Sequence, residues 1–304
     1  MKHAYLIMAH NNPKVLKVLL EMLDDERNDI FLHIDKKSSL LAQNTFSVNQ
    51  ARLFILENRI SVFWGGYTQV QAEMLLFRES NKHGPYLYYH LLSGVDLPIK
   101  SQEYIHDFME KHKGKEFIGY QPKDERIKKM IKFRVGRWWL MQRYFRADGN
   151  LLKWIRRTFF NIIARPFVRR IDMDFQKGAT WVSLSEGCVC YLLESEKIIA
   201  KRFKYTFCPD ELFIQTVVCA NSRFYNNVYN PSSEYDSCMR EIDWTRGRPY
   251  TWTSADKAIL KHSEKLFARK FSESDMEIVS WIKDEFASPS TASNNVEDLG
   301  ERTT

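Results

Sequence analysis

The stretch AYLIMAHNNPKVLKVLLEML, residues 4–23, and the stretch IFLHIDKK, residues 30–37, determine the fold class of this chain. Ala4–Ala9 is a continuous apolar run and predicts a buried strand. Pro13 suits the first turn of a helix, and leucines and valines then recur at helical spacing. Ile30–Ile34 predicts a second buried strand. A strand, a helix and a strand at this spacing form a βαβ unit, which requires a parallel sheet and indicates an α/β protein.

Polar and aromatic residues follow the ends of several predicted strands. His10 and Asp35 come directly after the first two strands, and Lys100 follows a further buried strand at Tyr86–Leu92. Ligands of parallel sheets bind beyond the carboxyl ends of the strands, so these positions are candidates for a binding site. Two glycines in the loop Trp64–Tyr67 let the backbone approach a flat ligand. Surface polar residues and a plain turn remain the alternatives at these positions.

The composition indicates a folded protein of ordinary type. The chain has 304 residues, of which 44% are hydrophobic and 27% charged. We expect one domain over residues 1–286 and a disordered tail over 287–304, which is rich in Ser, Thr and Asn. The sequence has no apolar run long enough for a transmembrane helix, and the first apolar run is too short for a signal peptide. Five cysteines, an odd number, favour a reducing compartment and a cytoplasmic location.

Residues 123–170 form a strongly basic segment. They contain 15 Lys and Arg against 3 Asp and Glu, a net charge of +12, whereas the whole chain carries only +7. Tryptophans and phenylalanines alternate with the charges, so a helical insert at about 123–172 is expected. Binding to an anionic membrane surface is the first interpretation, and a solvated cover over the core is close behind. Nucleic acid is a distant third, because no nucleic-acid motif accompanies the charges.

The stretch CPDELFIQ, residues 208–215, holds the main candidate for an acid–base group. Pro209 suits the start of a helix, and Asp210 and Glu211 would lie where the positive end of the helix dipole stabilises carboxylates. An ordinary acidic helix start explains the same pattern. Further on, Leu266–Phe271 predicts the end of a helix with cations at its carboxyl end.

Eight motifs in one order resemble a known family. The chain resembles the core-2/I-branching N-acetylglucosaminyltransferases and the peptide O-xylosyltransferases over about residues 4–271, with its closest likeness to compact bacterial members. The motifs are AYLIMAH, FLHIDKKS, SVFWGGYTQVQAE, LLSGVDLPIKS, GATWVSLS, CPDELFIQTV, IDWTRGRP and LFARKF. The resemblance implies a GT-A-type fold, a Rossmann-like mixed sheet flanked by helices. It also implies an inverting enzyme that uses a nucleotide-sugar donor and needs no metal ion.

The resemblance also implies roles for individual residues. The catalytic base falls on Glu211, with Asp210 as its rival. Cations take the place of a metal ion in neutralising the leaving diphosphate. The donor-binding residues implied are His10, Asp35, Trp64, Arg248 and Lys270, and the acceptor-binding residues are Lys100 and Trp244.

The triplet Asp172-Met173-Asp174 argues instead for a metal ion, because it has the DxD pattern that binds metal in many GT-A enzymes. It precedes a predicted strand instead of following one in the nucleotide half of the chain. Charge balance against Arg169 and Arg170 is therefore the preferred interpretation, and no metal ligand is expected.

These observations predict transfer of a sugar to a hydroxyl of a glycan or lipid-linked oligosaccharide in bacterial surface polysaccharide synthesis. GlcNAc from UDP-GlcNAc is the expected donor, and a xylosyl- or glucosyltransferase is the alternative. A non-catalytic relative that binds nucleotide sugars or glycans is the competing class. We expect no cofactor beyond the donor, no nucleic-acid partner, and a cytoplasmic location that extends to the inner face of the membrane.

Overall fold

The structure is a computed structural model that describes residues 1–144, 168–247 and 249–287. Arg248, much of the predicted insert at 123–172 and almost all of the predicted tail at 287–304 lie outside the described residues. All five cysteines are free. Within the described ranges, no helix is both long and apolar enough to cross a membrane.

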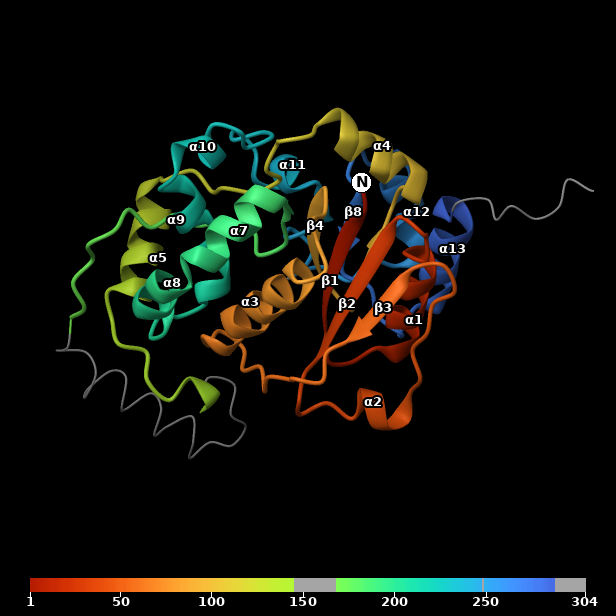
Figure 1. Ribbon diagram of the computed structural model, residues 1–304, viewed down its shortest axis with the longest axis horizontal. Coiled ribbons are helices and arrows are strands. Elements are labelled where there is room, and N and C mark those ends of the chain that lie inside the picture. The colour runs from red at the N-terminus through yellow and green to blue at the C-terminus, as the bar shows by residue number, and fades with distance from the viewer. Residues whose placement is uncertain (145–167, 248, 288–304) are drawn as a thin grey trace, which may run out of the picture.

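A five-stranded sheet forms the centre of the molecule (Figure 1). Its strands lie in the order β3-β2-β1-β4-β6, with the first four parallel and β6 antiparallel to β4. The predicted Rossmann-like mixed α/β sheet is thus confirmed. The strands are β1 (His3–Ala9), β2 (Asn28–Ile34), β3 (Arg52–Ile55), β4 (Tyr88–Ser93) and β6 (Ser183–Ser185).

Helices cover both faces of this sheet, because its central strands are apolar on both sides. Alternate residues of β1 face opposite cores, with Tyr5 and Ile7 in one cluster and Ala4 and Leu6 in the other. The first face is covered by α1 (Pro13–Met22), α4 (Gln102–Lys111), α12 (Lys257–His262) and α13 (Met276–Phe286). The second is covered by α3 (Thr68–Asn81), α5 (Glu125–Val135), α7 (Glu186–Glu194), α8 (Glu196–Phe203) and α9 (Phe213–Cys219).

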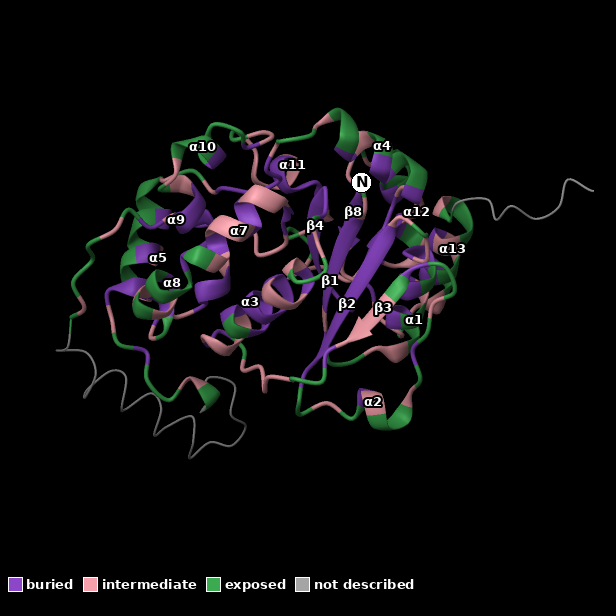
Figure 2. Cartoon of the chain, in the orientation of Figure 1, coloured by how far each residue is buried: buried purple, intermediate pink, exposed green. Residues whose placement is uncertain are grey.

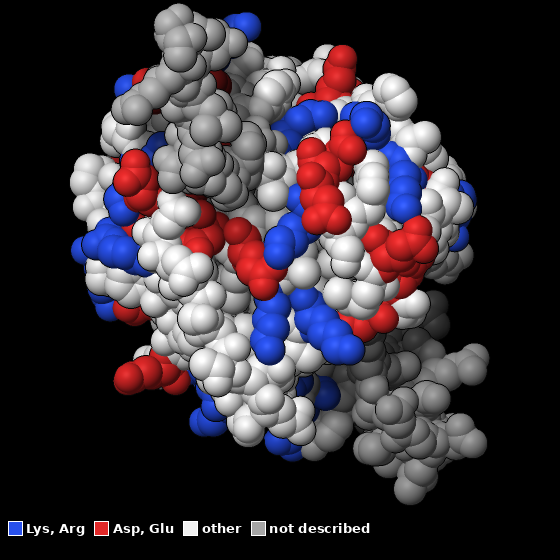
Figure 3. Space-filling model, turned by 90° about the vertical axis from the view of Figure 1, so that its right-hand side faces the viewer, with Lys and Arg blue, Asp and Glu red and all other residues white. Residues whose placement is uncertain are grey.

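The outer faces of α1, α4, α5, α8, α12 and α13 carry exposed residues, whereas α9, β1 and β2 are buried along nearly their whole length (Figure 2). Acidic and basic side chains lie side by side on the face that carries α12 and α13 (Figure 3), where Lys257 pairs with Glu277 at 2.6 Å. Short elements complete the described chain. They are α2 (Leu40–Gln43), α10 (Ser222–Tyr225), α11 (Glu234–Cys238), η1 (Gln142–Tyr144), η3 (Pro209–Glu211) and η4 (Ser254–Asp256).

A second, three-stranded sheet has the order β5-β8-β7, with β5 (Asp96–Pro98), β7 (Arg240–Ile242) and β8 (Phe267–Arg269). The helix end predicted at Leu266–Phe271 is therefore wrong, because this segment contains strand β8. Its apolar run is too short for periodicity to separate strand from helix. Phe267 and Ala268 are fully buried, and β8 bonds to β5 on one side and β7 on the other.

Two buried contacts join the sheets. Asp96 accepts a hydrogen bond from Ser93 Oγ at 2.8 Å and pairs with Arg269 at 2.6 Å. Arg240 donates to the Val182 carbonyl at 3.0 Å, from β7 to the residue before β6. The carboxyl ends of β1, β2, β4, β7 and β8 consequently lie along one edge of the molecule, and this edge carries the candidate site.

Candidate active site

Glu211 lies in a tight turn rather than in the first turn of a regular helix. Pro209 begins the 3₁₀ turn η3, and Leu212, with φ −131°, separates that turn from α9. Cys208 adopts φ 46°, and its N–H donates to the Gly65 carbonyl at 2.9 Å. The predicted regular helix start at Pro209 needs this correction, because the fixed φ of proline suits a 3₁₀ turn as well. Neighbouring side chains, not the dipole of α9, therefore set the charge environment of Glu211.

Two cations hold the Glu211 carboxylate by one oxygen. Arg134 Nη1 lies 2.8 Å and Lys177 Nζ 3.0 Å from Glu211 Oε2. The Glu211 side chain is 31% exposed, against 12% for Arg134 and 9% for Lys177. Burial raises the pKa of Glu211, but the two cations outweigh burial and hold it below its ordinary value. Within the described residues Oε1 has no partner, so this oxygen can accept a hydrogen bond from a substrate hydroxyl.

Asp210 has the opposite environment. Its Oδ2 accepts hydrogen bonds from Thr180 Oγ1 at 3.2 Å and Gln69 Nε2 at 3.4 Å, whereas the buried Oδ1 has no partner among the described residues. Burial, and then the charge of Glu211, raises the pKa of Asp210 to about 7. Glu73 is fully buried, neither of its oxygens has a described partner, and burial followed by Asp210 raises its pKa. Asp210 is therefore shielded from substrate, and the geometry favours Glu211 as the base.

His10 and Asp35 lie together beyond the ends of β1 and β2, as the sequence predicts. The Asp35 N–H donates to the Ala9 carbonyl at 2.9 Å, and Ser38 Oγ donates to the His10 carbonyl at 2.8 Å. Burial lowers the pKa of His10, Asp35 partly opposes that shift, and Arg269 adds to it. A neutral imidazole has one donor and one acceptor nitrogen, which suits hydrogen bonding to a ligand.

The loop that carries Trp64 is attached to the turn that carries Glu211. Gly65 has φ +70°, and a Cβ at this position would lie 2.9 Å from the Phe207 ring. Its N–H donates to Gln69 Oε1 at 2.7 Å, and its carbonyl accepts from Cys208. The exposed Trp64 ring meets Phe207 edge-on at a centroid distance of 5.7 Å. Glycine at 65 thus serves close approach of two backbone segments, and it fixes Trp64 relative to the acid.

Lys270 follows β8 at the same edge. The Lys270 N–H donates to the Tyr250 carbonyl at 3.4 Å, and its carbonyl accepts from Trp252 at 3.0 Å. In the described part of the chain no side chain pairs with the Lys270 ammonium, whereas neighbouring Arg269 is paired with Asp96. An ammonium that is free of internal partners is available to an anionic ligand.

Trp244 also lies at this edge, because it follows β7 and Ile242 of β7 pairs in register with Arg269. The Trp244 side chain is exposed. It borders a pocket of about 460 Å³ whose other walls include Tyr235, Glu241, Arg246 and Trp252.

Lys100 lies elsewhere. Pro98 of β5 pairs with Phe267 at the start of β8, so Lys100 is at the opposite end of the second sheet from Lys270. Its ammonium donates to the Ser263 carbonyl at 2.7 Å, and burial lowers its pKa. The structure brings together Glu211, Trp64, His10, Asp35, Lys270 and Trp244 along one edge, but it does not bring Lys100 to them.

The two acids of the DxD triplet are held by cations, though not by the predicted ones. Asp172 pairs with Arg202 at 2.5 Å, and Asp174 pairs with Lys123. Arg169 instead donates to Thr206 Oγ1 at 3.1 Å and to carbonyls of α8, so it acts on Asp172 through its charge and not through an ion pair. Within the described ranges no cluster of three or more His, Cys, Asp or Glu side chains is arranged to hold a metal ion. Metal independence remains a prediction.

Sequence reasoning missed three residues of this site, and two of them carried a signal. Arg134 lies three residues after Ile131 on α5, within the buried face of that helix. Glu73 is the one acid on the buried face of α3. Lys177 follows no periodic pattern, because it lies in an irregular segment.

Comparisons with known proteins identify the family of this chain. The family model described as Core-2/I-Branching enzyme matches residues 3–277. Xylosyltransferase 2 of Rattus norvegicus is 22% identical over 254 residues, covering 80% of this chain and 26% of the relative. Xylosyltransferase oxt of Drosophila melanogaster is 22% identical over 277 residues, covering 83% of this chain and 30% of the relative. The chain thus spans less than a third of the length of these two relatives.

Among solved structures, the apo form of mouse xyloside xylosyltransferase 1 has a TM-score of 0.37 at 10% identity, covering 88% of this chain and 97% of that chain. The sequence motifs and the family match extend over nearly the whole described chain. This chain belongs to the Core-2/I-Branching enzyme family.

Proposed function

We propose that this chain is an inverting glycosyltransferase that moves a sugar from a UDP-linked donor to a hydroxyl of a glycan acceptor. The observation that supports this most is the Glu211 carboxylate, which is anchored through Oε2 and open at Oε1. It lies along the same edge as the donor-binding candidates His10, Asp35, Trp64 and Lys270.

The proposed reaction is an in-line displacement at the anomeric carbon. The acceptor oxygen forms a bond to that carbon as the bond from the carbon to the diphosphate oxygen breaks. The hydroxyl proton passes to Glu211 Oε1. A carboxylate with a lowered pKa is a weak base but stays ionised, and it accepts the proton once the forming bond has acidified the hydroxyl. Lys270, and by family resemblance Arg248, would neutralise the charge that UDP gains.

The donor sugar has two candidates. The two relatives described above are named xylosyltransferases, which supports xylose. The resemblance to branching enzymes supports GlcNAc. Incubation with UDP-xylose, UDP-GlcNAc and UDP-glucose, read by UDP release and by thermal shift, tests both, since a bound donor raises the melting temperature by mass action. No shift and no UDP release with any of them would favour the non-catalytic alternative.

Catalysis without a metal ion is also proposed. The Lys270 ammonium, which has no ion pair within the described ranges, and the ion pairs at Asp172 and Asp174 support it. Activity that persists in excess EDTA is expected. Full loss in EDTA that Mn²⁺ restores would contradict this proposal.

A cytoplasmic enzyme at the inner face of the membrane, acting in bacterial surface polysaccharide synthesis, is the cellular role we propose. Phe133, Trp138 and Met141 are exposed beside Lys132 and Arg137, which supports binding to an anionic lipid surface. Stronger partitioning onto anionic than onto neutral vesicles is expected, and equal partitioning would count against it. The α5 part of the basic segment also covers the core, because Ile127, Ile131 and Val135 are buried. We propose no nucleic-acid partner.

A further inference from the structure

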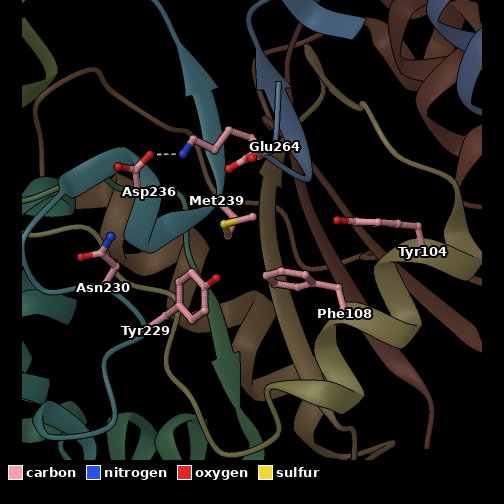
Figure 4. Close-up of a pocket in the computed structure, with 8 residues that line it drawn as sticks. Tyr104, Phe108, Tyr229, Asn230, Asp236, Met239 and Glu264 are labelled. Atoms are coloured by element: carbon pink, nitrogen blue, oxygen red, sulfur yellow. Dashed lines mark hydrogen bonds and ion pairs between the residues drawn. The ribbon is translucent and has the colours of Figure 1, made fainter. Parts of the chain in front are cut away.

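A second pocket opens at the other end of the second sheet (Figure 4). Its volume is about 400 Å³, within the usual range for small-molecule sites. Tyr104 and Phe108 on α4 form one wall and Tyr229 the facing wall, and Figure 4 shows these three rings around the opening. The polar rim consists of Asn230, Asp236, Glu264 and Lys265.

The aromatic wall offers both ring faces and hydroxyl groups. Tyr104 and Phe108 are stacked at a centroid distance of 6.3 Å, and Phe108 meets Tyr229 at 5.9 Å. Tyr104 is 46% exposed. In the described part of the chain the hydroxyls of Tyr104 and Tyr229 have no hydrogen-bond partner. A sugar ring, with its C–H faces and its rim of hydroxyls, satisfies both the ring faces and these free hydroxyls.

The charges around this pocket cancel. Lys265 pairs with Asp236, and the charge of Glu264 acts on the neighbouring Lys100. Two cations therefore face two anions. A phosphorylated or sulfated ligand would meet no excess positive charge here, so the pocket suits a neutral sugar.

The pocket is linked to the candidate active site by α11 and β7. Tyr235 of α11 borders the pocket around Trp244, and the next residue, Asp236, lines the aromatic pocket. Burial raises the pKa of Tyr235, with Glu234 and then Glu211 adding to the shift, which places Tyr235 within electrostatic reach of the proposed base. The two pockets thus lie on either side of one short segment.

A strip of polar contacts runs between the two pockets. Glu241, which borders the Trp244 pocket, accepts a hydrogen bond from Ser263 Oγ at 2.7 Å. The Ser263 carbonyl accepts from Lys100, and Glu264 and Lys265 follow directly. These contacts connect residues that border the two pockets.

We propose that the aromatic pocket is a distal subsite that binds a neutral sugar unit of the acceptor, at a distance from the hydroxyl that reacts at Glu211. This inference rests on the proposed function, since it assumes a glycan acceptor. With this subsite, Lys100 lies beside the distal part of the acceptor although it does not lie near Glu211. A long acceptor then binds more tightly than a short one, because only the long one spans both pockets.

A binding experiment tests the subsite without requiring transfer. The full chain with Glu211→Gln is applied to an immobilised panel of neutral oligosaccharides of increasing length, together with sulfated counterparts. Binding of neutral glycans that increases with length is expected. Adding Tyr104→Ala or Glu264→Gln should weaken it about fivefold for the long glycans. Tyr225→Ala is the control, because Tyr225 is similarly exposed at 41% but its ring meets Tyr120, at a centroid distance of 5.7 Å, and does not line the pocket.

Kinetics supply the second test. Tyr104→Ala in the otherwise unchanged chain should raise KM for long acceptors about fivefold, and leave kcat and the KM of the shortest acceptor unchanged. An equal KM ratio at every length, or absence of neutral-glycan binding by a folded chain, would overturn the subsite. Length-dependent binding that Tyr104→Ala weakens, without transfer from any donor, would overturn the proposed function and leave the subsite standing.

Discussion

Asp210 and Glu211 are neighbours in sequence, yet the regions around their carboxyl groups are opposites. Glu211 faces Arg134 and Lys177, and its pKa lies below the ordinary value. Asp210 is buried beside Glu73 and has no ion pair in the described part of the chain. Arg134 offsets its burial only in part, and the pKa of Asp210 is raised to about 7. Residue type therefore says little about protonation in a buried site. The partners that the fold brings from distant segments decide which acid is charged.

The largest expected loss of transfer activity is that of Glu211→Gln, which removes the charged member of the pair. Glutamine keeps the shape of the side chain but cannot accept the acceptor proton, so transfer should fall by about 10²–10⁴-fold. UDP-sugar binding, followed by thermal shift, should persist. Asp210→Asn is the matched variant at the adjacent position, and it should lose less activity than Glu211→Gln. The reverse order would assign the base to Asp210.

Removal of one cation should raise the pKa of Glu211 toward that of Asp210. Lys177→Met deletes a charge 3.0 Å from Oε2, so the pKa of Glu211 rises. In the wild type, Glu211 stays ionised at mildly acidic pH, and the rate should not fall there because of this group. In the variant the acidic limb of the pH–rate profile should move to higher pH, so that the variant loses more of its rate at mildly acidic pH than the wild type does. Lys177→Arg should restore the wild-type profile, and an unmoved limb in Lys177→Met would contradict the assigned role.

The buried Asp210, beside Glu73, should make the stability of the folded chain depend on pH. The pKa of Asp210 is about 7 in the folded chain, against an ordinary value of 3.8, so the folded state binds more protons between those values. Stability from this group is complete below about pH 4, falls as pH rises toward 7, and is constant above that. Asp210→Asn removes this dependence. Its melting temperature relative to wild type should rise by a few degrees from pH 4 to 7, and a constant difference would refute the raised pKa.

The two regions also show what a sequence can predict. The βαβ unit, His10 and Asp35 at its strand ends and the DE pair are all visible in the sequence, because each depends on local periodicity or on position after a strand. The environment of the DE pair is not, since Arg134, Lys177 and Glu73 come from three separate segments. A pattern within one stretch of sequence does not show which of these three side chains contacts which of the two acids.

Very short strands are also difficult to predict from the sequence. Strand β8 was predicted as the end of a helix, because Phe267–Arg269 is too short to show a period and its strand form depends on β5 and β7 on either side. Lys100 illustrates the consequence for function. It is near a strand end in sequence, but the antiparallel pairing of β5 with β8 carries it away from the edge that holds Lys270.

Asp174 is an exposed carboxylate, in contrast to Asp210 and Glu211, and its replacement should have the smallest effect on stability and activity. Its side chain is 81% exposed and its partner is Lys123, so water competes with the ion pair. Asp174→Ala should lower the free energy of unfolding by at most about 1 kcal/mol in urea titrations. It should leave the transfer rate and its response to EDTA unchanged, because the acid lies outside the Glu211 site. A loss of activity that Mn²⁺ modifies would instead give the DxD triplet a metal role and remove the contrast between an exposed, solvated carboxylate and the two that the fold controls.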